Sequence, residues 1–116
     1  MFKKLRTVIY HVNDIGAAKK WYADITGVAP YFDEPFYVGF DINGCELGLD
    51  PDFTHVNTGG NQSVTYWAVD SLKISLEKLK NAWARILQPI TNVGGDIHVA
   101  IVTDPFGNSV GLIEGA

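Results

Sequence analysis

The feature that most constrains the fold of this chain is a pattern of secondary structure that occurs twice. In each half, the residues predict a strand, then a helix, then three strands. The two expected helices begin at Asp14 and Ser71, which lie 57 positions apart in a chain of 116 residues. Both residue types cap helix N-termini, because their side-chain oxygens accept from backbone N–H groups there. We therefore interpret the chain as an internal repeat of two modules, although the halves share no visible letter identity.

The first half predicts this pattern through the spacing of its apolar residues. The run LRTVIYHV at 5–12 alternates and is rich in β-formers, which indicates a strand. After Asp14, IGAAKKWYADIT has helical spacing, and Gly27 is a typical helix end. Short strand-like runs follow around VAPYF, FYVGFDI and CELGLD, and Asn43-Gly44 between the last two is typical of a hairpin turn.

The second half repeats the order after a loop expected at 51–61. SVTYWAV predicts a strand, and the segment after Ser71 predicts an amphipathic helix. ILQPITNV, DIHVAIVT and NSVGLIE predict three more strands, with a turn at 105–108. The predicted fold is α+β: one domain of two βαβββ modules, about 1–57 and 58–116. Each helix covers one face of its sheet, so we expect the other faces to form a curved mixed sheet around a cleft.

Composition is that of an ordinary globular domain and excludes several classes of function. Apolar residues make up 47% of the chain and charged residues 19%. The net charge is −4 and the nine Lys and Arg are scattered, which argues against nucleic-acid binding. No run approaches the ~20 apolar residues of a membrane span. The first apolar run is too short for a signal peptide, and the one cysteine, Cys45, excludes an internal disulfide. We therefore expect a cytoplasmic protein with neither nucleic-acid nor membrane partners.

Four stretches of the sequence resemble the vicinal oxygen chelate superfamily, which includes glyoxalase I, extradiol dioxygenases and bleomycin-resistance proteins. They are HVNDIGAAKKWYADITG at 11–27, NGCELGLD at 43–50, VTYWAVDSL at 64–72 and TDPFGNSVGLIEG at 103–115. The DPFGN turn followed by a strand ending in Glu is the most specific of these. The resemblance implies the paired-module fold and a homodimer. It is less specific for the reaction, because this superfamily hosts several chemistries and pure binding functions.

The resemblance also implies where a metal would bind. In metal-using members each half supplies one ligand from its first strand and one near the end of its last strand. The corresponding positions here are Thr7, Asp50, Val64 and Glu114. Thr7 is a weak oxygen ligand and Val64 cannot ligate, whereas the family's usual site needs nitrogen donors as well. We therefore expect no cofactor; the alternative is a divalent metal (Mn, Mg, Ni or Zn) held by Asp50 and Glu114.

Alternation along the predicted strands assigns side chains either to the cleft or to the helix-covered face. Thr7, Ile9 and His11 are expected to face the cleft together. The further cleft-facing groups are expected to be Tyr66 with Val64 and Ala68, Glu114 with Leu112 and Val110, and Asp50 with Glu46 and Gly48. Trp67 is expected to face the helix. The predicted ligand-binding residues are Thr7, Ile9, His11, Tyr66, Leu112 and Glu114.

Glu114 and His11 are the candidate catalytic residues. Glu114 follows two apolar residues of the expected cleft, where a carboxylate is partly desolvated; the alternative is a solvated chain end. His11 suits a general base near neutral pH; the alternative is a polar residue at a strand end. Asp50 has two interpretations. It is either part of the cleft wall or the first residue of a turn, since Asp50-Pro51-Asp52 is typical of a turn.

The remaining reactive residues predict less. His98 has an ambiguous face, His55 is expected in solvent, and Cys45 is expected in the core, so no pair of nucleophile and base is recognisable. Trp83 departs from the expected pattern, because a small residue or Gly is expected near the end of a helix. A large aromatic side chain there suggests that it covers the sheet or a partner surface.

Aromatic residues of the first half favour a binding function. They cluster in its middle strands, and the members are Tyr31, Phe32, Phe36, Tyr37 and Phe40. An acidic cleft lined by aromatic rings suits a flat or cationic organic molecule. Two functions follow from the resemblance. The first is a metal-free protein that binds a small molecule, as bleomycin-resistance proteins do; the missing first-strand ligands favour it. The alternative is a metal-dependent lyase or dioxygenase that uses Asp50 and Glu114, and a metal-independent enzyme with Glu114 or His11 as its base also stays open.

Overall fold

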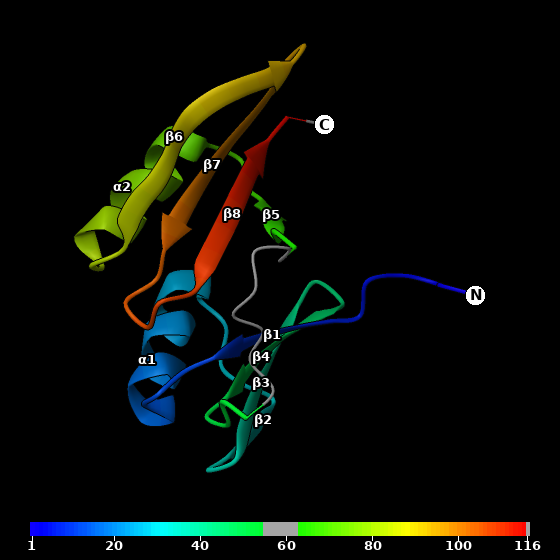
Figure 1. Cartoon of the computed structure of the whole chain (residues 1–116), viewed down its shortest axis with the longest axis vertical. Helices are drawn as coiled ribbons and strands as arrows, with labels where there is room; N and C mark the ends of the chain where they lie inside the picture. The colour runs from blue at the N-terminus through cyan, green and yellow to red at the C-terminus, as the bar shows by residue number, and fades with distance from the viewer. Residues whose placement is uncertain (55–62, 116) are drawn as a thin grey trace. The chain divides into compact units, whose positions relative to one another are not determined.

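The computed structural model describes residues 1–54 and 63–115. The chain divides into two compact units, Met1–Thr58 and Gly59–Ala116. Each unit contains one α-helix and one four-stranded mixed sheet (Figure 1). The element order is β1-α1-β2-β3-β4 in the first unit and β5-α2-β6-β7-β8 in the second. This order confirms the predicted α+β fold and its repeated βαβββ modules.

The first unit consists of β1 (Thr7–His11), α1 (Ile15–Thr26), β2 (Phe32–Glu34), β3 (Tyr37–Ile42) and β4 (Cys45–Asp50). Its strand order is β1-β4-β3-β2, with β1 parallel to β4 and the other pairs antiparallel. The strand expected around VAPYF begins later than predicted. Pro30 has no N–H to donate, so pairing begins after it, where the N–H of Tyr31 donates to the carbonyl of Gly39 at 3.0 Å.

The caps of α1 are those that the sequence predicts. The Asp14 carboxylate accepts from the N–H of Ala17 at 3.0 Å. Gly27 has φ +72° and donates its N–H to the carbonyl of Ala23. Glycine adopts this left-handed conformation without the steric penalty of a Cβ, so the helix ends there.

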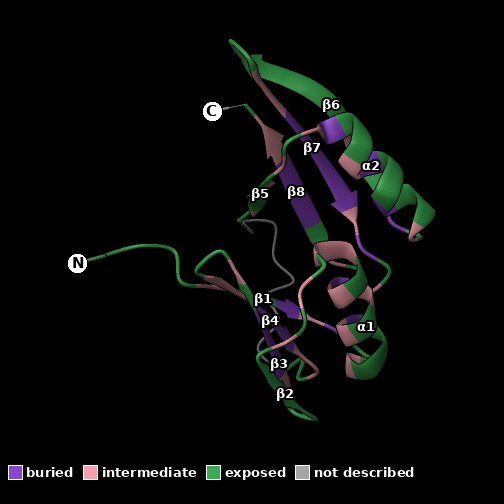
Figure 2. Cartoon of the chain, turned by 180° about the vertical axis from the view of Figure 1, so that it is seen from behind, coloured by how far each residue is buried: buried purple, intermediate pink, exposed green. Residues whose placement is uncertain are grey.

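The core of the first unit lies between α1 and one face of its sheet. Tyr10 of β1 stacks on Tyr22 of α1 with ring centroids 5.7 Å apart. On the same side, Lys19 of α1 forms a 3.1 Å ion pair with Asp33 of β2. Burial drives this packing, since each fully buried large apolar side chain contributes about 1.5–3 kcal/mol. The buried residues, purple in Figure 2, include Val12, Ala18, Val38, Phe40, Leu47 and Leu49.

The second unit consists of β5 (Tyr66–Ala68), α2 (Leu72–Asn81), β6 (Arg85–Gly94), β7 (Ile97–Thr103) and β8 (Ser109–Glu114). Its strand order is β5-β8-β7-β6, and β5 is parallel to β8. This repeats the topology of the first unit. The strand expected over SVTYWAV is shorter than predicted. Of the loop expected at 51–61 the structure describes residues 51–54, and His55 lies outside the described residues.

The DPFGN turn is organised by a buried carboxylate. Asp104 is 3% exposed. Its Oδ1 accepts from the N–H groups of Phe106 and Asn108 at 2.9 and 2.8 Å, and its Oδ2 accepts from the Asn108 side chain at 3.2 Å. Buried acceptors and donors are costly to leave unpaired. The most specific motif of the sequence therefore fixes the turn between β7 and β8.

Trp83 occupies the position after α2 where glycine is usual. Its φ is +76°, and the next residue, Ala84, donates its N–H back to the carbonyl of Leu79 at 3.0 Å. The Trp83 side chain is 83% exposed, so it does not cover the sheet. In the part of the chain that the structure describes, no helix has both the length and the apolar character to cross a membrane.

Candidate functional site

One face of the first sheet, which we call the open face, is the side opposite α1. Directly paired residues point to the same side of a sheet. The register pairs Thr7 with Glu46, Ile9 with Gly48, and His11 with Asp50. Thr7, Ile9 and His11 therefore share the open face, as alternation predicts. Across β3 and β4, the same face carries Gly39 opposite Gly48 and Asp41 opposite Glu46.

Glu46 is the centre of the polar contacts on this face. The Tyr37 hydroxyl donates to Glu46 Oε2 at 2.5 Å. The Tyr31 hydroxyl donates to the other oxygen, Oε1. We call these three residues the Glu46 cluster. Hydrogen bonds to an ionised carboxylate are shorter and stronger than those between neutral groups, so the two tyrosines hold the carboxylate in one orientation.

Two glycines make room for the tyrosine rings of the Glu46 cluster. A Cβ added at Gly48 would overlap the Tyr37 hydroxyl. A Cβ added at Gly39 would lie 3.2 Å from the Tyr31 ring and 3.4 Å from Glu46 Oε1. Any larger residue at Gly48 would displace Tyr37, because overlap of this kind cannot be relieved by small shifts. The hydrogen bonds of Glu46 therefore depend on Gly39 and Gly48, which leave the sheet surface under the two rings free of side chains. We call these two residues the glycine floor.

The surroundings of Tyr37 keep its hydroxyl protonated. Burial is the main cause that raises the pKa of Tyr37 above its ordinary value of 10.0, and the negative charge of Asp50 raises it further. The positive charge of Arg6 acts in the opposite direction. Both raising effects disfavour the phenolate. Tyr37 is therefore a donor to Glu46 throughout the physiological pH range.

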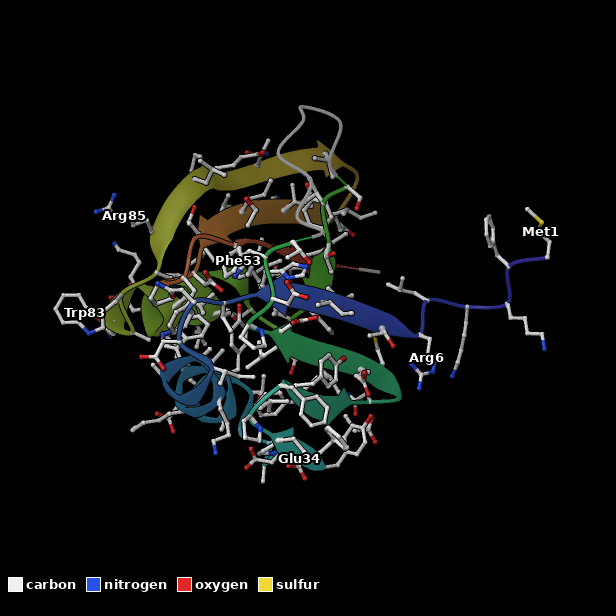
Figure 3. The ribbon with its side chains drawn as sticks, turned by 60° about the horizontal axis from the view of Figure 1, so that its bottom comes forward. Met1, Arg6, Glu34, Phe53, Trp83 and Arg85 are labelled. Atoms are coloured by element: carbon white, nitrogen blue, oxygen red, sulfur yellow. The ribbon has the colours of Figure 1, made fainter. Side chains whose placement is uncertain are left out.

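A pocket of about 420 Å³ opens beside the Glu46 cluster. It is lined by Arg6, Tyr31, Asp41, Gly44 and Glu46. Figure 3 labels Arg6 where the N-terminal segment joins β1, next to the β3–β4 hairpin. The Arg6 guanidinium donates to Thr7 Oγ1 at 2.6 Å. Concave sites of this volume suit small organic ligands.

His11 and Asp50 lie at the other end of the open face. The Nδ1 atom of His11 is 2.6 Å from the carbonyl oxygen of Asp52, and its ring centroid is 6.0 Å from that of Phe53. Asp50 Oδ1 accepts from the N–H of Asp52 at 2.8 Å. Short aspartate side chains stabilise turns in this way. The hydrogen bond from Asp52 to Asp50 agrees with the interpretation of Asp50 as the first residue of a turn.

The second unit corrects the face predicted for Glu114. Trp67 pairs with Leu112, so Leu112 and Glu114 share the face of Trp67. Val110 and Leu112 are buried, and Glu114 Oε1 accepts from the N–H of Leu72, the first residue of α2, at 2.7 Å. The prediction that these β8 residues face the cleft was wrong. Two apolar residues preceding the acid at alternate positions indicate the helix-covered core face instead.

Glu114 stabilises the start of α2. A helix N-terminus has unpaired N–H groups and a partial positive charge, which a carboxylate satisfies. The Ser71 hydroxyl accepts from the N–H of Ile74 at 3.2 Å. Two residues from different elements therefore complete one helix end. The catalytic and ligand-binding roles considered for Glu114 stay predictions.

The opposite face of the second sheet carries Tyr66, as alternation predicts. Tyr66 pairs with Gly111. A Cβ added at Gly111 would lie 2.5 Å from the carbonyl oxygen of Thr65 and 2.7 Å from the Tyr66 ring. A tyrosine ring lying against a glycine backbone thus occurs in both units.

The donors on the open face do not fit the metal site that the resemblance implies. The first-strand position is Thr7, whose Oγ1 accepts from Arg6. Glu46 lies directly opposite, and both of its oxygens accept from tyrosine hydroxyls. Across residues 1–54 and 63–115, no three His, Cys, Asp or Glu side chains are grouped as a metal site requires. The described residues therefore do not supply the ligand set of that metal site.

Four residues of this site, Glu46, Tyr31, Arg6 and Asp41, were not among the site residues predicted from the sequence. Alternation places Glu46 on the same face as Asp50, so Glu46 could have been predicted as a site residue from the sequence. The tyrosine partners depend on the register between neighbouring strands, and one of them precedes its strand. Spacing along the sequence does not encode those cross-strand contacts.

Solved structures share this fold. The chain matches a glyoxalase/bleomycin resistance protein/dioxygenase family enzyme from Burkholderia phytofirmans PsJN with a TM-score of 0.75 and 20% identity, over 97% of this chain and 98% of that one. A lactoylglutathione lyase from Agrobacterium tumefaciens matches with a TM-score of 0.70 and 16% identity, over 97% and 93%. TioX from Micromonospora sp. ML1 matches with 0.71 and 15%, over 98% and 100%. At these identities the likeness shows the fold.

Sequence comparison identifies the family. No curated protein matches the chain. The family model described as Glyoxalase/Bleomycin resistance protein/Dioxygenase superfamily matches residues 4–112, nearly the whole chain. The match confirms the resemblance drawn from the four sequence stretches. The chain belongs to the glyoxalase/bleomycin resistance protein/dioxygenase superfamily.

Proposed function

We propose that this chain binds a small organic molecule on the open face of its first sheet, without the metal site usual in the superfamily. The observation that carries the proposal is the Glu46 cluster beside the 420 Å³ pocket. A carboxylate held by two tyrosines is a preorganised acceptor, and preorganisation lowers the entropic cost of binding.

Aromatic rings beside the cluster supply apolar contact area. The ring centroid of Phe32 is 6.0 Å from that of Phe36 and 6.2 Å from that of Tyr37. Tyr31 is 63% exposed and Phe36 is 65% exposed. Exposed aromatic groups next to fixed polar groups are typical of ligand sites. One relative in fold is a lyase, but a shared fold does not choose between catalysis and binding.

The donor set favours binding over metal-assisted catalysis. A metal site needs enough ligands in a suitable geometry, and no three His, Cys, Asp or Glu side chains within residues 1–54 and 63–115 are grouped in that way. Thr7 and Glu46 already accept hydrogen bonds from Arg6 and the two tyrosines. Asp50 accepts from the backbone of its own turn. These existing hydrogen bonds support binding of an organic molecule by the residues in their present orientations.

The test is a small-molecule screen read by amide chemical shifts of the isotopically labelled protein. We expect ligands to perturb the residues of the open face. Glu46→Gln should weaken binding about tenfold, because a charge-assisted hydrogen bond is lost. Asp24→Asn is the matched control, since Asp24 is an exposed acid of α1 paired with Lys20. Shifts confined to other surfaces would refute the proposal.

Metal analysis separates this proposal from the alternative enzyme. The protein, purified without chelator, would be assayed for bound Mn, Mg, Ni and Zn before and after their addition. We expect no stoichiometric metal. Near-stoichiometric metal that disappears in Asp50→Asn and in Glu114→Gln would instead support the metal-dependent lyase or dioxygenase. On family membership we also infer a homodimer, which light scattering of the purified chain tests.

A further inference from the structure

We propose that the pocket beside the Glu46 cluster takes a small zwitterion, a compound that carries an ammonium group and a carboxylate a few bonds apart. The inference rests on the proposed function and names the chemical class of its ligand. It comes from the charges that line the pocket, which are one cation, Arg6, and two acids, Asp41 and Glu46.

The cation and the acids of this pocket do not pair with each other. Ion pairs closer than 4.0 Å include Lys19–Asp33 and Lys20–Asp24, and within the described residues none involves the charged groups of this pocket. Arg6 forms none, although it shares a small pocket with two carboxylates. Its guanidinium donates to Thr7 and has five N–H donors in all. The pocket therefore holds opposite charges apart, and a ligand with both charges complements both.

The acidic side of the pocket is fixed in position before any ligand binds. Tyr31 and Tyr37 hold the two oxygens of Glu46. Asp41 Oδ1 accepts from the N–H of Gly44 in the β3–β4 turn at 2.8 Å. A carboxylate has about four lone-pair sites, so both acids keep acceptor capacity for an ammonium group. The exposed ring of Tyr31 adds a face that attracts cations.

Arg6 supplies the complementary side. Its planar guanidinium matches a carboxylate with two parallel hydrogen bonds, a geometry that lysine does not offer. A ligand with only a positive charge would be repelled by Arg6 and would give its guanidinium no carboxylate partner. A ligand with only a negative charge would face Asp41 and Glu46. The lining therefore selects a zwitterion over either singly charged analogue.

The experiment compares three forms of the same compound by isothermal titration calorimetry. The probes are aromatic and aliphatic amino acids, their methyl esters, which keep only the cation, and their N-acetyl derivatives, which keep only the anion. We expect the best amino acid to bind about tenfold or more tightly than either derivative, since one well-placed charged contact corresponds to about that factor.

Variants assign each charge to its residue. Arg6→Gln should remove the preference for the amino acid over its ester, and Glu46→Gln should remove its preference over the N-acetyl form. Asp41→Asn provides a second acidic variant if Glu46→Gln alters the fold, which circular dichroism reveals. Lys20→Gln, on the exposed surface of α1, is the matched control and should change nothing.

The outcomes separate this inference from the proposed function. Esters that bind as tightly as the amino acids, with no effect of Arg6→Gln, would overturn the zwitterion while leaving small-molecule binding intact. Binding of no amino acid at the open face, while another class of compound binds there in the screen, would have the same meaning. Absence of any ligand at the open face would overturn both.

Discussion

Removing the Tyr37 hydroxyl tests whether the Glu46 cluster stabilises the first unit. In Tyr37→Phe the ring remains and only the donor to Glu46 Oε2 is lost. A hydrogen bond to a charged group contributes about 1.5–3 kcal/mol when buried. This one is part-buried, and water can replace the lost donor, so we expect a loss below that range, about 1 kcal/mol. For a domain of this length that corresponds to a fall in Tm of about 4 °C.

The pH dependence has a definite sign. The pKa of Tyr37 is raised in the folded chain above 10.0, chiefly by burial and also by the charge of Asp50. A raised pKa means that folding favours the protonated phenol. The stabilisation from this group is therefore fully present below pH 10.0 and is lost as pH rises through the higher folded value. The stability difference between the native chain and Tyr37→Phe should shrink above that pH.

The assay is urea unfolding of both chains at neutral pH and at a series of pH values above 10. Tyr66→Phe is the matched control, because the Tyr66 hydroxyl has no hydrogen-bond partner in the part of the chain that the structure describes. It should cost close to nothing. If Tyr37→Phe is no less stable than Tyr66→Phe at neutral pH, or if its deficit does not change with alkaline pH, the assigned role of the cluster is wrong.

Four other substitutions probe separate parts of the fold. Gly48→Ala should destabilise by about 1–3 kcal/mol and abolish ligand binding, because its methyl group overlaps the Tyr37 hydroxyl; unfolding and titration measure both effects, and a stable, ligand-binding variant contradicts the glycine floor. Trp83→Gly should stabilise by about 1 kcal/mol by relieving the positive φ, whereas Trp83→Ala should not; equal midpoints in urea would refute this. Asp104→Ala should cost about 3 kcal/mol, since it leaves buried donors unpaired, and a thermal melt near that of the native chain would contradict the role of the turn. Glu114→Gln should cost about 0.5–1 kcal/mol through the start of α2 without changing binding at the first sheet, so lost binding would return Glu114 to the site.

The parts of the fold that depend on local rules could be predicted from the sequence. Asp14 and Ser71 cap helices because their short oxygen-bearing side chains reach backbone N–H groups. Gly27 ends α1 through its positive φ. Alternation placed Thr7, Ile9 and His11 on one face, since side-chain direction along a strand has a strict period of two.

The candidate site was harder to predict because it depends on which strands pair and in what register. Alternation defines two faces of β8 but does not say which one α2 covers, so Glu114 was placed on the wrong side. Glu46 receives its partners from outside β4, where Tyr37 lies on β3 and Tyr31 precedes β2. Contacts between strands follow from the register, which turns and packing of the whole sheet determine.

The glycine floor has a consequence for changing what the protein binds. Gly39 and Gly48 each leave space for a tyrosine ring, that of Tyr31 and that of Tyr37, so a side chain introduced at either position acts first on the ring and only indirectly on a ligand. A mutant library that varied these glycines would mostly sample damaged scaffolds. Diversity placed instead at Thr7 and Asp41, which have side chains on the same face, would alter the chemistry of the surface while keeping its shape. The two glycines mark the fixed frame of an adaptable binding surface.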